Sequence, residues 1–313
     1  MNQFAPQASI EGMSHKVRWD LPLPGIGETP RRLLMLSQIA RRDLSAGRLA
    51  EGHTDAVAIL AEAGVPARQD ALYGVWTADD PDEVVRADRL PEELGWRLHG
   101  MKRSCCGSTL VNAVMVTAQV DEAWLLFDVG INEHVQAQPP QWPISALADA
   151  RIADVTFDTI VLGTDSAIGP ADWYLRRPGF WHGAVSAAAV WAGGAMSLID
   201  AARELRPASR GAREQLGALE AIAWQLGAIL DQCGREIDED PRDNTARARV
   251  RALMVRHLVE RACTEVMERF GRATGDHFLA HDAFIANQFA GLNLCIRQAR
   301  IDRELETIPD FGY

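Results

Sequence analysis

The second half of the chain is a succession of four long amphipathic segments, at about 181–205, 211–238, 244–271 and 282–305. In each of them apolar residues recur every three or four positions, as on one face of a helix. Short breaks separate the segments, at Arg206-Pro207, at Asp240-Pro241 and between Gly271 and Gly275. Four long helices with short connections predict a four-helix bundle.

Two helices are expected before residue 70. Thr29 and Pro30 supply an N-cap followed by a proline at the first helical position, and apolar residues then follow at helical spacing. The second helix should run from about Gly52 to Ala63, because Gly64 and then Pro66 end it.

From Leu72 the pattern changes to short β-rich runs separated by turn residues. Strands are expected at 72–77, 95–102, 111–119, 123–129 and 155–162. Asp121-Glu122 is so short a link that the two runs on either side of it should form a hairpin. The sequence therefore predicts an α+β fold with a short N-terminal helical region (1–70), a small β-barrel or sheet domain (71–170) and a C-terminal four-helix bundle (171–313).

Composition excludes several classes of function. The formal net charge of −11, from 43 acidic and 32 basic residues, argues against a nucleic-acid-binding surface. The most apolar stretch, 183–199, is shorter than the roughly 20 residues that span a bilayer, so no membrane segment is expected. Neither a Rossmann, a P-loop nor a G-x-S-x-G pattern occurs.

The cysteines indicate a reducing compartment. There are five, an odd number, and no basic segment followed by an apolar one opens the chain, so we expect reduced thiols in a cytoplasmic protein. Cys105 and Cys106 are adjacent, and no C-x-x-C or histidine-rich pattern occurs. A metal site is therefore not expected.

Three short motifs stand in the β-rich half. Gly95–Lys102 reads Gly-Trp-Arg-Leu-His-Gly-Met-Lys, Ser104–Ser108 reads Ser-Cys-Cys-Gly-Ser, and Tyr73–Thr77 reads Tyr-Gly-Val-Trp-Thr. In that order they resemble the G-x-x-[ILV]-x-G-x-K strand, the W-I-[TS]-x-G or F-[CS]-[ST]-G segment and the Y-x-V-T-E strand of the acyl-CoA dehydrogenase family. Phe270-Gly271 and His281-Asp282-Ala283 are similar to that family's F-G-G and R-D-A landmarks. Together with the order of helices, β domain and bundle, the resemblance covers about residues 28–305.

The resemblance implies an acyl-CoA dehydrogenase-like fold and a flavoprotein oxidoreductase that uses FAD. Its substrate would be an acyl thioester or a related small molecule, and an electron-transfer partner is among the partners it would have. The residues expected to bind the cofactor are Tyr73, Val75, Thr77, Ser104, Cys106, Ser108, Trp181 and Arg272. A homodimer or a dimer of dimers is also expected, because the bundle helices carry more apolar surface than one bundle interior needs.

The chain departs from the family at its catalytic position. Ala290, followed by Gly291, stands where the resemblance places a catalytic glutamate, and an alanine cannot accept a proton. A base would have to be another group, and an imidazole titrates near neutral pH. His182, at the entry of the first bundle helix, is the first candidate and His53 the second; packing or capping histidines fit the same positions.

Two further departures concern cofactor and substrate. Glu268–Arg272 stands in place of the family's Q-x-x-G-G, and the helical region before Tyr73 is much shorter than the family's N-terminal domain. Three functions therefore stay open: an FAD-dependent oxidoreductase with a different base, a flavin monooxygenase that needs no such carboxylate, and a non-catalytic scaffold or partner subunit of the same fold.

Overall fold

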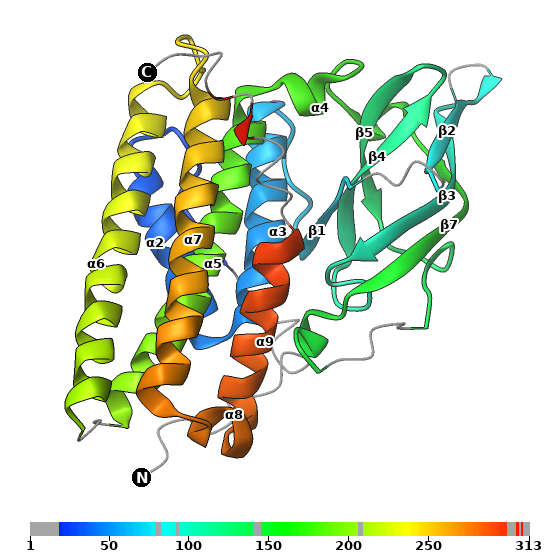
Figure 1. Ribbon diagram of the computed structural model, residues 1–313. Helices are drawn as coiled ribbons and strands as arrows, with labels where there is room; N and C mark the ends of the chain where they lie inside the picture. Colours follow the sequence, from blue (N-terminus) through cyan, green and yellow to red (C-terminus); the bar gives the residue numbers. More distant parts are fainter. Residues whose placement is uncertain are drawn as a thin grey trace. The chain divides into compact units, whose positions relative to one another are not determined.

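The computed structural model describes residues 19–78, 83–91, 94–139, 145–205, 209–298, 305–306 and 308 (Figure 1). The chain divides into two compact units, each described here by itself. The β unit comprises Met1–Asp20, Gly52–Pro143 and Ala148–Arg177; the helical unit comprises Leu21–Glu51, Ile144–Leu147 and Pro178–Tyr313. The helical unit thus contains the first helical residues together with the C-terminal helices. The division into three consecutive domains that was expected from the sequence stays a prediction.

The β unit is built on an eight-stranded sheet. Its strands are β1 (Tyr73–Trp76), β2 (Arg86–Arg89), β3 (Trp96–Cys105), β4 (Ala113–Val120), β5 (Ala123–Gly130), β6 (Val135–Ala137), β7 (Ala153–Leu162) and β8 (Ala167–Ile168). Their order is β6-β7-β3-β2-β4-β5-β8, and β1 pairs with β4 in parallel. The expected hairpin is confirmed as β4–β5, where Val120 pairs with Ala123 around the turn.

Both faces of β4 are buried, because its side chains alternate between two apolar clusters. Val114, Val116 and Ala118 join the larger cluster, which also holds Phe127 and Phe157. On the other face, Ala113 and Met115 pack with Ala56, Ile59 and Leu60 of helix α3 (Leu44–Glu62). The central hairpin is thus fixed from two sides within the β unit.

The helical unit contains α2 (Thr29–Arg42), α5 (Pro178–Glu204), α6 (Arg210–Glu239), α7 (Ala248–Thr274), α8 (His277–His281) and α9 (Ala283–Gln298), with the first part of α3. The long helices α5, α6 and α7 lie side by side (Figure 1). The four expected C-terminal helices are present. The break at Arg206-Pro207 and the expected helical residues 299–304 lie outside the described residues.

Helix α3 begins at Leu44, eight residues before the expected start at Gly52. Asp43 is the physical reason, because its carboxylate accepts a hydrogen bond from the Ala46 N–H at 3.1 Å and so caps the helix. Gly52 instead lies inside the helix beside β1, where an added Cβ would stand 3.8 Å from the Val75 nitrogen.

A carboxylate from α6 caps the N-terminus of α2. Asp238 accepts hydrogen bonds from the N–H groups of Gly27 and Thr29, at 3.0 and 2.9 Å, and from the Thr29 hydroxyl at 2.5 Å. Such a carboxylate satisfies otherwise unpaired helix N–H groups and favours the positive end of the helix dipole. Asp238 is thus a cap that another helix supplies to the start of α2.

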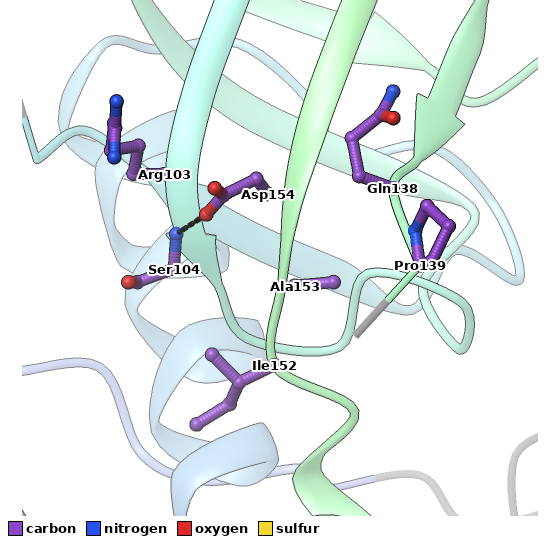
Figure 2. A pocket seen from close by; sticks show the side chains of 7 residues that line it. All are labelled: Arg103, Ser104, Gln138, Pro139, Ile152, Ala153 and Asp154. Carbon is purple, nitrogen blue, oxygen red and sulfur yellow. Dashed lines mark hydrogen bonds between the residues drawn. The ribbon is translucent and has the colours of Figure 1, made fainter. Parts of the chain in front are cut away.

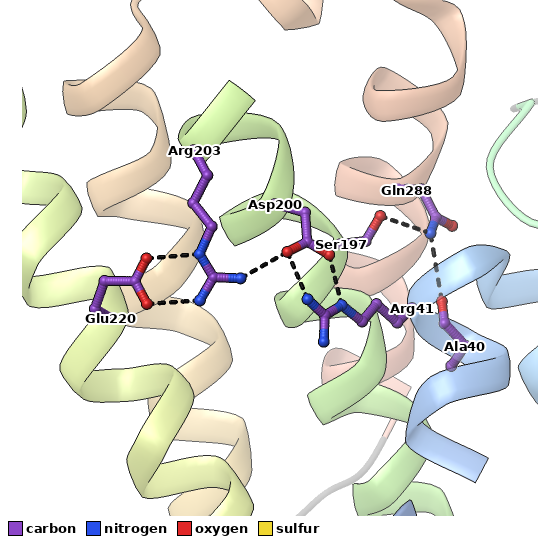
Figure 3. A network of polar contacts seen from close by, with 7 residues as sticks. All are labelled: Ala40, Arg41, Ser197, Asp200, Arg203, Glu220 and Gln288. Atoms are coloured by element: carbon purple, nitrogen blue, oxygen red, sulfur yellow. Dashed lines mark hydrogen bonds and ion pairs between the residues drawn. The ribbon is translucent and has the colours of Figure 1, made fainter. Parts of the chain in front are cut away.

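An ion-pair network joins α2, α5 and α6 (Figure 3). Arg41 binds Asp200 through two nitrogens, at 2.5 and 2.6 Å, and Arg203 binds both Asp200 at 2.7 Å and Glu220 at 2.6 Å. The hydrogen bonds from Arg203 lower the pKa of the Glu220 carboxyl. The groups are half-exposed, so each ion pair alone adds little to the stability of the helical unit.

Helix α5 is by length and composition apolar enough to cross a membrane, but 78% of its apolar window is buried in the structure. A helix in the core of a water-soluble protein can have the same length and apolar composition. The helix continues the apolar stretch noted at 183–199 in both directions.

Candidate functional site

Strand β1 and the segment after β3, which are far apart in the sequence, meet in the β unit. The indole N–H of Trp76 donates to the carbonyl oxygen of Cys106 at 2.9 Å. Gly74 makes room for this indole, because a Cβ there would lie 2.9 Å from the Trp76 Nε1. Two of the segments that carry the family resemblance are thereby held side by side.

The segment Ser104–Ser108 is anchored by the start of β7 and by the residues just before it. Ser104 N–H donates to the Asp154 carboxylate at 2.8 Å, and Gly107 N–H donates to the carbonyl of Ala150 at 2.8 Å. Ser108 donates to the carbonyl of Arg151 from both its N–H and its hydroxyl, at 3.0 and 2.7 Å. The pairing of β3 with β7 shifts register between Lys102 and Cys105, an irregularity of the kind that re-aims residues next to functional sites.

Lys102, the lysine of the G-x-K motif, is buried and forms its hydrogen bonds within the β unit. Its ammonium donates to the Thr117 hydroxyl at 2.9 Å and to the carbonyl of Ala78 at 3.4 Å, and it lies 5.6 Å from the centre of the Trp124 ring. It therefore ties the residue that follows Thr77 to β4. Burial also raises the pKa of the Cys105 thiol, which makes Cys105 a packing residue rather than a nucleophile.

The expected cofactor-binding side chains of the β unit divide into two groups. Tyr73 and Ser108 are buried and already bonded: the Tyr73 hydroxyl accepts from Arg68 N–H at 3.0 Å, and burial raises its pKa. Ser104 is exposed, and Val75, Thr77 and Cys106 are partly exposed. Only this second group can present side-chain atoms to a ligand.

His53 is held by the backbone of β1. Its Nδ1 accepts a hydrogen bond from Tyr73 N–H at 3.2 Å, and burial lowers the pKa of the ring. The imidazole is therefore neutral near pH 7, with its proton on Nε2 and its lone pair engaged. In this arrangement His53 can donate a hydrogen bond but has no free lone pair with which to accept a proton.

His182 is buried in the helical unit at 5% exposure. Its Nε2 lies 3.0 Å from the carbonyl oxygen of Pro241, and since a carbonyl only accepts, Nε2 carries the proton. The other ring nitrogen, Nδ1, is buried as well. The catalytic role of His182 stays a prediction, and this geometry does not favour it.

The remaining expected site residues also lie in the helical unit. Trp181 packs edge-on against Phe180, with ring centres 5.1 Å apart, and the Arg249 guanidinium lies 5.6 Å from its ring. Arg272 is ion-paired with Glu268 of the same helix on the surface. Ala290 is exposed on α9.

A pocket of about 200 Å³ opens beside Ser104 (Figure 2). Arg103, Ser104, Gln138, Pro139, Ile152, Ala153 and Asp154 line it. The pocket is smaller than the roughly 300–1,000 Å³ of sites for drug-sized ligands, so it can hold a fragment of one. Sequence reasoning missed Gln138, which follows β6, and Asp154, the second residue of β7, since neither belongs to a motif. Among the described residues, no group of three or more His, Cys, Asp or Glu could hold a metal ion.

Solved structures of other proteins share this architecture over most of the chain. Dibenzothiophene monooxygenase TdsC from Paenibacillus sp. A11-2 has a TM-score of 0.78 at 15% sequence identity, over 90% of this chain and 82% of TdsC. KijD3 in complex with FMN and dTDP-3-amino-2,3,6-trideoxy-4-keto-3-methyl-D-glucose has a TM-score of 0.77 at 15% identity, over 89% and 79%. PigA with FAD and proline has 0.73 at 14% identity, over 90% and 81%.

The chain has the acyl-CoA dehydrogenase-like fold. The expected fold class is thereby confirmed. The sequence matches no family profile and no curated protein. Among these neighbours, TdsC and KijD3 have been seen with FMN and PigA with FAD.

Proposed function

We propose that the chain is a flavin-dependent monooxygenase acting on a small organic molecule. The protonation of the two candidate bases, His53 and His182, favours a monooxygenase over a dehydrogenase. An acyl thioester dehydrogenase must abstract a proton with a group in hydrogen-bond reach of the substrate. Ala290 cannot do so, the lone pair of the His53 Nδ1 is engaged by Tyr73 N–H, and His182 carries its proton on Nε2, toward the Pro241 carbonyl, while its Nδ1 is buried. A monooxygenase has no need of that base.

The exposed part of the Ser104–Ser108 segment fits the ring of a flavin. A flat aromatic ring needs a wall of small side chains and a few polar groups at its edge, and the segment offers the partly exposed Cys106 and the exposed Ser104 hydroxyl. The backbone of the segment is already bonded to 150–154 and to Trp76, so the wall is rigid before any ligand arrives. Bound flavin would transfer electrons to oxygen. The flavin itself would first have to be reduced by an electron-transfer partner.

The FAD expected from the sequence stays a proposal, with FMN as the competing form. Arg272, one of the residues expected to bind the cofactor, is already ion-paired with Glu268, so its guanidinium is less available to the diphosphate of FAD. An arginine paired with a carboxylate attracts a phosphate less than an unpaired one. We therefore expect FMN to bind at least as tightly as FAD.

Two other functions remain as alternatives. Oxidation of an acyl thioester would require a rearrangement that frees His182 or His53. A scaffold or partner subunit would bind no flavin at all. The cytoplasmic location stays a prediction in each case.

Purified protein is expected to bind flavin. Titration with FMN and with FAD should quench flavin fluorescence, and the better ligand should stabilise the fold by about 2.7 kcal/mol when its free concentration is 100 times Kd. Fluorescence and thermal melting measure the two effects. If neither flavin is quenched and neither raises the melting temperature, the monooxygenase is excluded and the scaffold is favoured.

A bulky residue at Ser104 tests where the ring binds. Ser104→Trp should weaken flavin binding by about tenfold or more, a loss of roughly 1.4 kcal/mol, because the indole would cover the wall. Thr159→Trp is the matched control: Thr159 is likewise exposed, on β7, and has a φ of 54° against 53° for Ser104. Equal affinities of the two variants would place the flavin elsewhere.

We also propose a homodimer or a dimer of dimers formed through the bundle helices. Trp224 on α6 is 78% exposed, which is rare for a residue with so large an apolar surface. Light scattering at micromolar concentration should give twice or four times the mass of the chain. Trp224→Glu should lower that mass, and a monomeric wild type would overturn the proposal.

A further inference from the structure

The outward face of α6 is apolar in its middle. Trp224 is 78% exposed there, and Ala221 and Ala228, about one helical turn before and after it, are exposed beside it. From 215 to 230 the helix carries a single charged residue, Glu220, which already forms an ion pair with α5. An exposed indole on such a face is typical of the centre of a protein–protein interface, where tryptophan is enriched.

The two ends of the same face are charged and exposed. Arg210 and Glu214 lie near the start of the helix, and Asp231, Arg235 and Glu239 lie near its end. Arg210 and Glu214 pair along the helix at 3.0 Å, with 89% and 62% of their side chains exposed. Exposed pairs of this kind are weak, so each of these groups can also meet an opposite charge on another chain.

A second copy of α6 in antiparallel orientation matches these charges. The helix has 30 residues, and full antiparallel overlap sets its first residue opposite the last residue of the second copy. Arg210 then faces Glu239 of the second copy. Further inward, Glu214 faces Arg235. Because a two-fold axis relates the copies, each of these oppositely charged pairs occurs twice.

Other arrangements of the same two helices set like charges opposite each other. A shift by four residues in one direction brings Arg210 opposite Arg235 and, further inward, Glu214 opposite Asp231. A shift by four residues in the other direction brings Glu214 opposite Glu239. In a parallel pair every residue faces itself, so every charge meets its like. The charges therefore favour one orientation and one register.

The middle of the helix fits that register. The midpoint of α6 lies between Trp224 and Gln225, so the two indoles would lie beside the two-fold axis, and Ala221 would face Ala228 of the second copy. Such small side chains let two helix axes approach to the about 8–10 Å that is usual for packed helices. Burial of the indoles between them removes a large apolar surface from water.

We propose that two copies of the chain associate through antiparallel α6 helices, with the two-fold axis beside Trp224. The inference rests on the homodimer proposed above, to which it adds the helix, the orientation and the register. In a dimer of dimers, α6 forms one of the interfaces.

Engineered cysteines test the register. When Ala221→Cys and Ala228→Cys are combined in one chain, oxidation should link most chains into covalent dimers, because each new thiol faces the other one of the second copy within reach of a disulfide. Gly217→Cys with Ala228→Cys is the matched control: both positions are exposed on α6, but they face each other only after a shift by four residues. Electrophoresis without reductant measures both. Four of the five native cysteines are buried and Cys106 is partly exposed, so the oxidised wild type gives the background.

Charge reversal is an independent test, with the dimer Kd measured by sedimentation. Arg235→Glu and Glu214→Arg should each raise this Kd about 3- to 10-fold, because every dimer loses two exposed ion pairs. The two changes together should return the Kd toward the wild-type value. Each change also breaks a pair inside its own helix, with Asp231 or with Arg210. The double variant does not restore those pairs, so its recovery reports contact between copies.

The outcomes separate this inference from the homodimer itself. A dimeric wild type would keep the homodimer in place but overturn the α6 interface if Ala221→Cys with Ala228→Cys formed no more covalent dimer than the control pair. Losses that add in the charge-reversal double variant would do the same. A wild type that stays monomeric in light scattering would overturn both.

Discussion

Replacing Gly193 by alanine is expected to lower the free energy of unfolding by about 3 kcal/mol, at the upper end of the usual cost of overpacking a core. Gly193 lies in α5 where α2 crosses it. A Cβ at this position would stand 2.2 Å from the Ser37 carbonyl oxygen, 2.7 Å from the Ala40 Cβ and 3.0 Å from the Arg41 nitrogen. Two of these atoms are backbone, so α2 would have to move as a whole.

The sign of this effect is opposite to the usual one. An exposed glycine inside a helix normally gains about 0.5–1 kcal/mol of stability when it becomes alanine, because the unfolded chain loses freedom. Gly217 in α6 is the matched control, since nothing lies within 4 Å of a Cβ built there. Urea denaturation should show Gly193→Ala less stable and Gly217→Ala slightly more stable than the wild type. Equal shifts in both variants would mean that α2 and α5 do not pack at this distance.

Periodicity was sufficient to predict the long helices and the central hairpin. Helix α6 carries Leu219, Leu226 and Leu230 on one buried face, and the pattern of a single face is visible without knowing the partner. Strand β4 was visible for the related reason that its β-branched residues are buried on both sides. Such features depend on residues close together in the chain.

Elements with little buried surface escaped prediction. Strand β2 reads Arg-Ala-Asp-Arg, and Ala87 is its one buried residue, so neither hydrophobicity nor alternation marks it. Strand β6 (Val135–Ala137) lies where no strand was expected from the sequence, because its pairing with β7 is made by the backbone. Backbone hydrogen bonds to a neighbouring strand leave almost no trace in sequence.

The candidate site shows the same limit. The sequence selected His53 and His182 for the chemistry of imidazole, but their backbone partners lie 20 and 59 residues away and determine which nitrogen carries the proton. Asp238 likewise caps a helix 209 residues from it. Motifs locate the segments of a site, whereas the protonation and orientation of each group depend on contacts that only the folded chain supplies.

Gln288→Leu is expected to destabilise the helical unit by about 3 kcal/mol. The amide of this buried residue on α9 forms hydrogen bonds with the backbone where α2 ends and α3 begins, and Figure 3 shows its contacts with Ala40 and Ser197. Its Oε1 accepts from Leu44 N–H at 2.9 Å, and its Nε2 donates to the Ala40 carbonyl at 3.4 Å and to the Ser197 hydroxyl at 3.2 Å. Leu44 N–H is one of the unpaired donors at a helix start, and Ala40 C=O is one of the unpaired acceptors at a helix end.

Leucine has similar bulk but no polar atoms, so the variant would leave a buried N–H and a buried C=O without these partners, and each such loss costs about 1–3 kcal/mol. The adjacent Asn287→Leu is the control, because Asn287 is exposed and its Oδ1 accepts a hydrogen bond at the surface from the Ser145 hydroxyl, at 2.8 Å. The free energy of unfolding of this variant should stay within about 0.5 kcal/mol of the wild-type value. Urea denaturation of both variants gives the comparison. Hydrogen exchange at Leu44 should in addition become faster in Gln288→Leu, since its amide loses its acceptor. A variant as stable as the wild type, with unchanged exchange at Leu44, would show that water or a shifted backbone satisfies the junction without Gln288.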